Sequence, residues 1–577
     1  MTKLVKYLKP FAFGMILTIG FLYAQAMCDL YLPNLMSDII NDGIMRGQTD
    51  YILSIGMRML FFAFLGGVAT ISVSFISSKI AAGVARDLRR DIFAKVSGFT
   101  NAELDKFSTA SLITRSTNDV TQIQTFLMMG IRIVFFAPIM GIGGFVMAMN
   151  KAPSMSWIIA FSIVLLFLTI AIVFLIMTPR FKLIQKLVDK LNLVSRENLS
   201  GVMVIRAFGT QKFEEDRFDA ANVDITKVNL FINRVMAAVF PLIDVIFSST
   251  FILTVWVGAR HVADTDIQVG DMMAFMQYAM QVMMAFLFMA MMFMFIPRAA
   301  VSGARIAEVL TTESSVKDPS DNKKFSLMKK GLVEFKNVSF RYHNADEYAL
   351  RDLSFTAKPG ETTAIIGSTG SGKSTVANLL MRFYDVTEGQ VIVEGADVRE
   401  VTQHDLRQRI GYVPQKGVLI SGTIKSNLQY GDPNASDELI EKSAEVAQAL
   451  DFINEKTEVF DSEISQGGGN VSGGQKQRLS IARALVKNPN IFVFDDSFSA
   501  LDFRTDAALR RALKEHTDES TVIVIAQRVG TIMNADRILV LEKGRIVGSG
   551  THRELLKSCP EYYEIASSQL SGGELGV

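Results

Sequence analysis

Long hydrophobic segments with almost no charge alternate with polar segments over the first half of the chain. The first, from Pro10 to Cys28, is long enough to cross a hydrocarbon layer of about 30 Å as one helix. It is too long for a signal peptide and has no small-residue cleavage site. Five similar segments follow, and we expect six membrane-spanning helices near residues 10–28, 55–77, 126–149, 155–178, 236–258 and 272–296.

The charges around these segments predict the topology. Lys3, Lys6 and Lys9 precede the first span, which places the N-terminus in the cytoplasm. An even number of spans returns the chain to the same side. The segments 79–125 and 179–235 are long, polar and rich in helix-forming residues. We therefore expect both to be cytoplasmic helical extensions that reach toward a soluble domain.

Each extension contains a compact charged stretch. The first runs from Glu103 to Phe107 and the second from Gln211 to Phe218. Such stretches suit turns that dock on a soluble domain, and they equally suit a solvated helix face.

The sixth span is rich in methionine. Between Met272 and Met294 it holds ten of the 29 methionines of the chain, together with Phe275, Phe286, Phe288 and Phe293. Flexible, polarizable side chains can repack around different apolar ligands. This segment is therefore a candidate wall for an amphipathic substrate, with packing against lipid and neighbouring helices as the alternative.

Besides Arg58 near the start of the second span, three charged residues lie at span depth, namely Asp29 directly after the first span, and Arg132 and Asp244 within the third and fifth. Ionisable groups are costly in a bilayer and usually face a cavity or a partner. Asp244 lies deepest, and we expect it to serve in a substrate cavity or gate, or else to form a structural ion pair.

After the sixth span the composition becomes that of a soluble α/β domain. The 59 basic and 58 acidic residues give a net charge of +1, which does not indicate a nucleic acid partner. The two cysteines, Cys28 and Cys559, suggest neither a disulfide framework nor a metal site. The polar segment 311–330 is expected to link a membrane domain at 1–310 to a second domain at 331–577.

A glycine-rich loop lies near the start of the second domain. A strand-like segment, 362–366, runs into it and a helix-like segment, 375–382, follows it, which is the context that a phosphate-binding loop requires. Its N–H groups suit the phosphates of ATP, Lys373 suits phosphate charge, and the Ser374 hydroxyl suits Mg²⁺. The loop consists of Gly367, Ser368, Thr369, Gly370, Ser371, Gly372, Lys373, Ser374 and Thr375.

A second element typical of ATPases is the segment Ile491-Phe-Val-Phe-Asp495. Its four apolar residues fit a buried parallel strand, and Asp495 at the carboxyl end can belong to the Mg²⁺ shell. Asp496 follows where a catalytic carboxylate would orient the attacking water.

With these motifs, residues 331–557 resemble an ABC transporter nucleotide-binding domain. The resemblance implies that Tyr342 stacks on adenine and that Gln415 senses both Mg²⁺ and the membrane domain. The signature sequence of the family is matched from Val471 onward by Ser472, Gly473, Gly474 and Gln475, which are implied to bind ATP. The segments Ser499-Ala-Leu-Asp502 and Gly550-Thr-His552 match two further family motifs.

The whole chain resembles a bacterial multidrug-type ABC exporter half-transporter, in which an α-helical membrane domain of six spans precedes an α/β P-loop ATPase domain. The resemblance implies a head-to-tail dimer, with each ATP between the glycine loop of one chain and the signature of the other. It also implies export of amphipathic, drug-like, lipid or peptide molecules across the cytoplasmic membrane, with the N-terminus and the ATPase domain in the cytoplasm.

Besides Val471 of the signature, which stands where Leu is usual, the sequence departs from the family at three places. Asp496 stands where Glu is usual, and a displacement of roughly 1 Å can cost about 100-fold in rate. Gln527 stands where a His switch is usual, and Gln can donate a hydrogen bond but cannot carry a positive charge. The segment 466–469 reads Gln-Gly-Gly-Gly where a Glu-Arg-Gly pattern is common, so coupling to the membrane domain is expected to differ.

The changes at Asp496 and Gln527 together match the degenerate member of a heterodimeric exporter. In that interpretation this chain supplies a slow ATP site, and a different partner chain carries the catalytic Glu and the switch His. One alternative is a homodimeric exporter that uses Asp496 as its catalytic carboxylate. Another is an ATP-gated channel or sensor that does not depend on hydrolysis.

Overall fold

The computed structural model describes residues 2–343 and 345–570, without the side chains of residues 2, 3, 293 and 294. The outer ends of the two predicted domains, residue 1 and residues 571–577, thus lie outside the described residues, as do the side chains of Lys3, Phe293 and Met294. The chain forms two compact units. One takes the chain up to Ser97 and again from Thr109 to Thr312, and the other takes Gly98–Ser108 and the chain from Glu313 onward.

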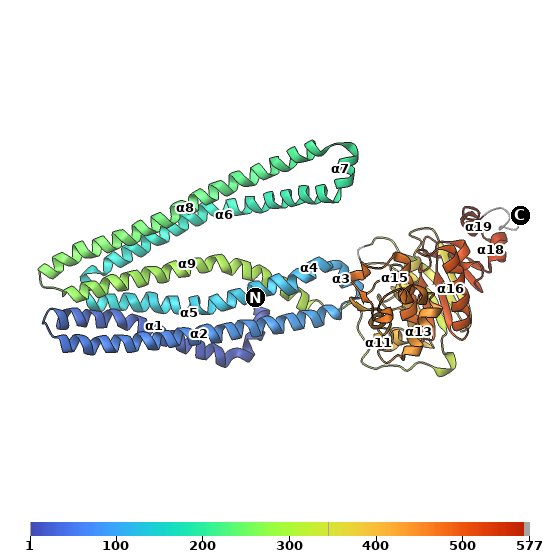
Figure 1. Ribbon diagram of the computed structural model, residues 1–577, viewed down its shortest axis with the longest axis horizontal. Helices are drawn as coiled ribbons and strands as arrows, with labels where there is room; N and C mark the ends of the chain where they lie inside the picture. The colour runs from blue at the N-terminus through green and yellow to red at the C-terminus, as the bar shows by residue number, and fades with distance from the viewer. Residues whose placement is uncertain (1, 344, 571–577) are drawn as a thin grey trace. The chain divides into compact units, whose positions relative to one another are not determined.

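Within the described residues, six helices are long and apolar enough to cross a membrane, which confirms the six predicted spans (Figure 1). The longest has 53 residues, which is about 80 Å at 1.5 Å per residue, whereas a hydrocarbon core is about 30 Å thick. The longest helices therefore extend well beyond a bilayer. The six are α1 (Ala12–Asp38), α2 (Thr49–Ser97), α5 (Val120–Lys151), α6 (Ser156–Ser200), α8 (Gln211–Ala263) and α9 (Val269–Thr311).

Short helices lie before and between the long ones. A 3₁₀ helix, η1 (Thr2–Phe11), precedes α1 and is fixed to α2 because the Tyr7 hydroxyl donates to Asp91 at 2.8 Å. The remaining connections of the first unit are η2 (Ile39–Ile44), α4 (Thr109–Thr114), η3 (Arg115–Asp119), η4 (Pro153–Met155) and α7 (Val202–Phe208).

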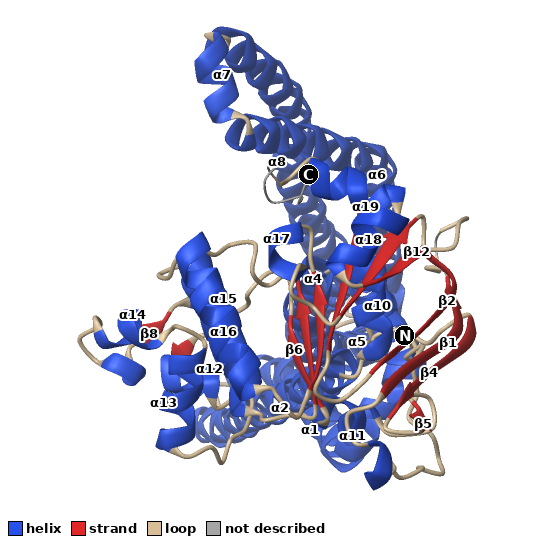
Figure 2. Cartoon of the chain, turned by 90° about the vertical axis from the view of Figure 1, so that its right-hand side faces the viewer, coloured by secondary structure: helices blue, strands red, loops and turns tan. Residues whose placement is uncertain are grey.

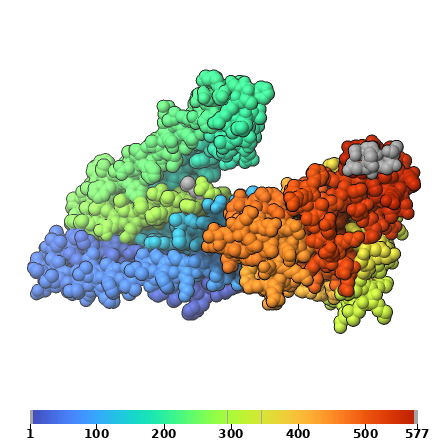
Figure 3. All heavy atoms as spheres, turned by 45° about the vertical axis from the view of Figure 1, so that its right-hand side comes forward, coloured from blue at the N-terminus to red at the C-terminus, as the bar shows by residue number. Residues whose placement is uncertain are grey.

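Helices α6 and α8, joined by α7, form a two-helix arm whose outer part stands clear of the other helices of the unit (Figures 1 and 3). Gly201 and Gly209 interrupt the helix on either side of α7, and Gly209 has a φ of +65° that few other residues adopt. The turn of the second extension is therefore at 202–208.

The docking turn predicted at 211–218 is wrong in position, because that stretch begins α8. Its charges pair along the helix surface. Lys212 lies 2.9 Å from Asp216, four residues on, and Arg217 lies 3.4 Å from Glu214. Such pairs stabilise an exposed helix, so the alternative of a solvated helix face holds here.

The first charged stretch lies in a short helix of the second unit, α3 (Asn101–Phe107). The buried Glu103 carboxylate accepts hydrogen bonds from the backbone N–H groups of Thr100, at 2.9 Å, and Ser315, at 3.0 Å. The Thr100 and Ser315 hydroxyls are 2.9 Å apart. Because a buried carboxylate with several donors is a strong tie, α3 is fixed to the segment that follows the last long helix.

The Met and Phe side chains of α9 divide between two faces. Phe275 and Met283 are fully buried within the unit. An exposed stripe at helical spacing comprises Met280, Met284, Phe288 and Met291. Part of the predicted methionine wall is therefore core, and part remains open to a ligand, lipid or second chain.

The three charged residues of the spans have different surroundings. Asp29 is partly buried, whereas Arg132 and Asp244 are exposed. Among the described residues Asp244 forms no ion pair. The structure thus gives no support to a structural ion pair at Asp244.

The second unit contains two principal sheets, separate from each other (Figure 2). An antiparallel sheet has the strand order β2-β1-β4-β5, and a six-stranded sheet has the order β12-β11-β3-β10-β9-β6. In the larger sheet every neighbouring pair is parallel except β11 with β12. The strands are β1 (Val333–Phe340), β2 (Leu350–Ala357), β3 (Thr362–Gly367), β4 (Glu388–Val393), β5 (Ala396–Asp397), β6 (Ile410–Val413), β7 (Gly422–Thr423), β8 (Glu463–Ile464), β9 (Ile491–Asp495), β10 (Thr521–Ile525), β11 (Arg537–Glu542) and β12 (Arg545–Gly550).

Helices connect and cover these strands. Several begin with a side-chain cap; the Asp502 carboxylate, for example, accepts from the N–H of Thr505 at the start of α16. The helices are α10 (Lys373–Leu380), α11 (Gln403–Gln408), α12 (Ile424–Leu428), α13 (Asp437–Val446), α14 (Leu450–Asn454), α15 (Gly473–Val486), α16 (Phe503–His516), α17 (Val529–Ile532), α18 (His552–Ser558) and α19 (Pro560–Ser567), with 3₁₀ turns η5 (Leu327–Lys329), η6 (Val459–Asp461) and η7 (Gln466–Gly468).

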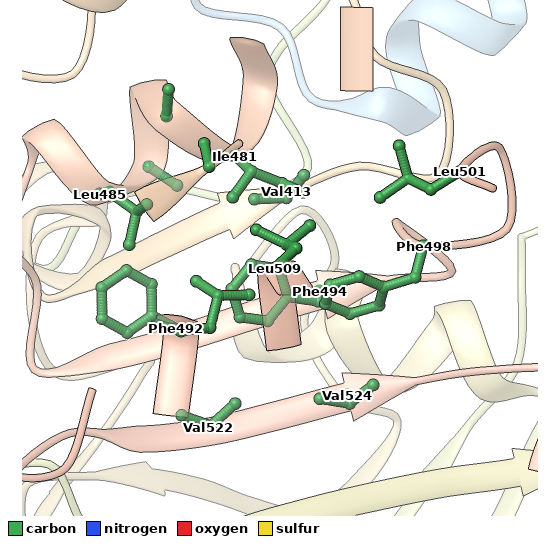
Figure 4. Close-up of a cluster of buried hydrophobic side chains, with 14 of the residues drawn as sticks. Val413, Ile481, Leu485, Phe492, Phe494, Phe498, Leu501, Leu509, Val522 and Val524 are labelled. Atoms are coloured by element: carbon green, nitrogen blue, oxygen red, sulfur yellow. The ribbon is translucent and has the colours of Figure 1, made fainter. Parts of the chain in front are cut away.

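The core of the second unit lies against the larger sheet (Figure 4). All five residues of β9 are buried, as its apolar sequence predicts for a central parallel strand. The rings of Phe492 and Phe494 lie nearly parallel, with centroids 6.1 Å apart, in the same buried cluster as Leu509 and Leu485.

We expect Phe492→Ala to destabilise the second unit. Phe492 is 1% exposed, and emptying such a site costs about 3–5 kcal/mol. For a unit of this size the melting temperature should fall by about 10 °C. Phe503→Ala, at a position 86% exposed, is the matched control and should change it little. Equal shifts in the two variants, measured by thermal unfolding, would contradict this account of the core.

Candidate functional site

The loops that carry the predicted chemistry leave one edge of the six-stranded sheet. Strands β3, β10, β9 and β6 are parallel neighbours, so their carboxyl ends point the same way. The glycine loop follows β3, Asp496 follows β9, and Gln527 and Gln415 each lie two residues beyond β10 and β6. This edge is where open parallel sheets bind ligands.

The glycine loop needs its glycines for close packing and for a left-handed turn. A Cβ at Gly367 would lie 2.0 Å from the Leu541 carbonyl oxygen. Gly370 and Gly372 have φ values of +82° and +100°, which favour glycine. Such a loop turns N–H groups and the start of α10 toward one point, as phosphate binding requires.

Lys373 and Ser371 add polar groups to this loop. Lys373 is 8% exposed, and its Nζ donates to the carbonyl oxygens of Gly367 and Ser368, both at 2.8 Å. Burial lowers the pKa of Lys373, while Asp496 and Asp495 act in the opposite direction. The Ser371 hydroxyl is buried and has no hydrogen-bond partner among the described residues. Both groups fit an oxygen-rich anion.

Ser374 and Asp495 form a hydroxyl–carboxylate pair. The Ser374 hydroxyl donates to Asp495 Oδ1 at 3.1 Å. Burial raises the pKa of Asp495, and this hydrogen bond opposes the rise. The described residues contain no group of three or more His, Cys, Asp or Glu side chains that could hold a metal. The pair nevertheless fits Mg²⁺, which usually binds one or two carboxylates together with waters and substrate phosphates.

Asp496 receives hydrogen bonds from two glutamines. Gln527 Nε2 donates to Asp496 Oδ2 at 3.0 Å, and Gln415 Nε2 donates to the same oxygen at 3.2 Å. Asp496 has a φ of +47°, a conformation that Asp adopts more readily than most residues. Burial raises the pKa of Asp496, and the Gln415 hydrogen bond and the Lys373 charge partly offset the rise. Gln415, predicted as a metal ligand, here contacts this carboxylate.

Tyr342 lies beside the loop within an aromatic cluster. Its hydroxyl is 3.1 Å from the Thr375 hydroxyl. Its ring meets those of Phe340 and Tyr384 edge to face, with centroids 4.8 and 5.2 Å away. Tyr384 was missed by sequence reasoning, and nothing in its local sequence indicates this contact. Its hydroxyl lies 3.4 Å from Asp105 of α3, so the cluster reaches the first charged stretch.

The signature residues lie apart from the glycine loop. Figure 2 shows α15 and α10 set apart, with the parallel strands between them. Ser472 is the N-cap of α15, and it exchanges hydrogen bonds with Gln475 in a capping box, at 2.9 and 3.3 Å. Ser472 and Gly473 are exposed, and Gly474 is partly buried. The start of α15 is thus open to a group from outside this chain.

The predicted residues therefore form two groups. One is an anion and cation site at the sheet edge, containing the glycine loop, Tyr342, Gln415, Asp495, Asp496 and Gln527. The other is the exposed start of α15 with Ser472, Gly473, Gly474 and Gln475. The first can hold phosphates beside a divalent cation and a carboxylate. The second can donate hydrogen bonds to an anion at a helix N-terminus.

Comparisons with protein families match both halves of the chain. Residues 15–286 match the family described as ABC transporter transmembrane region. Residues 350–499 match the family described as ABC transporter. The two matches fall on the six long helices and on the domain that carries the sheet-edge site.

Relatives match over nearly the whole chain. An uncharacterized ABC transporter ATP-binding protein of Mycobacterium tuberculosis is 39% identical over 96% of this chain and 95% of its own. One from Bacillus subtilis is 35% identical over 99% and 98% of the two chains. An ATP-dependent lipid A-core flippase of Haemophilus ducreyi is 29% identical over 99% and 98%. The solved structure of a bacterial Atm1-family ABC exporter with ATP bound is 25% identical, covers 98% of this chain and 99% of that chain, and has a TM-score of 0.80.

Proposed function

The chain belongs to the ABC transporter family, as an exporter half-transporter with a six-helix membrane domain and one ABC ATPase domain, and we propose that it supplies the slow ATP site of a heterodimer. Family membership makes it a multi-pass membrane protein in which ATP hydrolysis is coupled to transport. The observation that carries the finer proposal is the hydrogen bond between Asp496 and Gln527, at the positions of the catalytic carboxylate and the switch.

We assign ATP and Mg²⁺ to the sheet edge. Tyr342 offers a ring for adenine, and the loop from Gly367 to Thr375 offers N–H groups and Lys373 for the phosphates. The Ser374 hydroxyl and Asp495 carboxylate are already adjacent and would hold Mg²⁺, with Gln415 nearby. Bound Mg²⁺ would neutralise charge on the phosphate oxygens.

The slow turnover follows from the chemistry of two side chains. Asp496 is one methylene shorter than Glu, so its carboxylate does not extend as far toward an attacking water. Gln527 already donates to that carboxylate. An amide can donate to a γ-phosphate oxygen, but it cannot take up a proton and stabilise charge as a histidine can. Both features favour holding ATP over cleaving it.

A second chain completes the transporter. ABC half-transporters dimerise within a lipid bilayer, and two features of this chain are open to a partner. Ser472 presents the exposed start of α15. The end of the α6–α8 arm exposes large apolar side chains, with Leu199 79%, Met203 75% and Phe208 78% exposed. Apolar surface of this kind marks an interaction site.

The proposed partner is a different chain that carries Glu and His at the catalytic positions. In the dimer, Ser472 and Gly474 of this chain would then complete the fast site of the partner. A homodimer that uses Asp496 is the alternative, and the experiments below distinguish the two.

For the cargo we propose amphipathic molecules, drug-like or lipid-like, moved out across the cytoplasmic membrane. The exposed Met280, Met284, Phe288 and Met291 stripe on α9 suits apolar groups of varied shape. The flippase relative is named for a lipid. The lysines before the first span support an N-terminus and ATPase domain on the cytoplasmic side.

Removing the ring of Tyr342 should weaken ATP binding. Stacking on one base contributes about 1–3 kcal/mol, so Tyr342→Ala should raise the dissociation constant for ATP by about tenfold or more. Tyr342→Phe loses only the contact of the hydroxyl with Thr375 and should stay within about twofold of the original chain. Equal weakening in both variants, by equilibrium binding of a fluorescent ATP analogue, would count against a stacking role.

The chain purified alone in a lipid bilayer should hydrolyse ATP very slowly, and Asp496→Glu with Gln527→His should raise the rate by about tenfold or more. The longer carboxylate and the imidazole restore the groups that hydrolysis requires. A matched control adds Lys373→Ala to the double variant and should abolish the gain. Brisk turnover of the unmodified chain that Asp496→Asn removes would establish a homodimer instead.

In the complex with its native partner, Ser472→Ala should reduce ATP turnover more than Asp496→Asn does. Ser472 would contact the ATP of the fast site, whereas Asp496 belongs to the slow one. Ser436→Ala is the matched control, because Ser436 also caps a helix, accepting from the N–H of Leu439 at 3.2 Å. Equal losses of ATP turnover from Ser472→Ala and Asp496→Asn would contradict the proposed difference between the two ATP sites.

A further inference from the structure

The backbone of the loop that carries Gln527 is held by a side chain from far along the sequence. Gln569 lies in the turn that follows α19. Its Nε2 donates to the Gln527 carbonyl oxygen at 2.9 Å, and its Oε1 accepts from the N–H of Val529 at 2.8 Å. One amide thus pairs with the peptide groups on both sides of Arg528, in the pattern of a parallel strand.

The turn that presents Gln569 is itself anchored. Tyr562 and Ala566 of α19 are fully buried in the same core cluster as Val529 of α17. The Tyr562 hydroxyl lies 2.7 Å from His552 Nδ1. The N–H of Gln569 donates to the Ala566 carbonyl oxygen at 3.1 Å. The amide is therefore fixed relative to the start of α17, although its own side chain lies at the surface.

We propose that Gln569 is a positioning residue of the ATP site. By fixing the backbone at 527–529, it holds the Gln527 side chain where it donates to Asp496. With ATP bound, the Gln527 amide would be placed to donate to the γ-phosphate. This proposal rests on the proposed function in taking ATP as the ligand. It does not depend on whether the dimer is symmetric.

The two hydrogen bonds of Gln569 form a clamp that contacts peptide groups and not the side chain at 527. It would therefore hold a histidine at this position as well as the glutamine. Losing two neutral hydrogen bonds shifts the balance between the held and the displaced loop by about fivefold or more. The loss should appear where the γ-phosphate is recognised, and not where the adenine and the β-phosphate are bound.

The clamp itself is tested by hydrogen exchange on the full chain in a bilayer. In Gln569→Ala the Val529 amide should exchange about fivefold faster or more, because it has lost its acceptor. Ser568→Ala is the matched control, since the Ser568 hydroxyl in the same turn donates to the Ile565 carbonyl, at 2.8 Å, and within the described residues forms no hydrogen bond with 527–529. Unchanged exchange at Val529 in Gln569→Ala would overturn the proposal.

The positioning role is tested by comparing ATP with ADP. Gln569→Ala should lower the ratio of ATP to ADP affinity about fivefold and leave ADP affinity within twofold. In a Gln527→Ala background the same change should have no further effect, because Gln569 acts through that residue. The same loss in both backgrounds, or an equal loss of ADP affinity, would overturn the proposal. Failure of the unmodified chain to bind ATP would instead refute the proposed function, with the exchange measurement still deciding the clamp.

Discussion

The parallel pairing of β3, β10, β9 and β6 is the constraint on which the ATP site depends. In this ladder Ile365 is level with Ile525, and Ile525 is level with Asp495, so the loops that follow these strands begin at one height. The pairing also brings the glycine loop and Asp495 together, although they lie far apart in the sequence. A one-residue slip of β9 would turn the Asp495 side chain to the other face of the sheet. The hydrogen bond from Ser374 to Asp495 therefore depends on strand register.

The parts of the structure that can be predicted from the sequence are those with a local sequence signal. Six apolar segments with almost no charge predict the long helices, and the apolar run before Asp495 predicts a buried strand. The prediction of a turn at 211–218 is wrong because it relies on charge, whereas Gly201 and Gly209 on either side of 202–208 are the better signal. Contacts such as Tyr342 with Tyr384, or Gln569 with Gln527, join distant segments and depend on tertiary packing. No local pattern predicts them.

Two opposing effects act on the pKa of Asp496. Burial raises the pKa of this carboxyl, which favours its neutral form. The Gln415 amide, the Lys373 charge and Arg528 favour the carboxylate, as does the hydrogen bond that Gln527 donates. A glutamine can supply this stabilisation at any pH, whereas a histidine at 527 would do so according to its own protonation. The replacement of histidine thus keeps the carboxylate paired while removing a titrating group from the site.

The separation of the two groups of site residues explains how a chain can lose one role and keep the other. The geometry at Ser472 rests on a capping box closed by Gln475, three residues away, and involves neither Asp496 nor Gln527. Changes at the sheet edge therefore leave the start of α15 intact. In a head-to-tail dimer that helix start serves the site of the partner, so selection can act on it independently of hydrolysis in this chain. In the proposed heterodimer, a slow site that mainly holds ATP would then remain part of the closed dimer while the partner cleaves its own ATP.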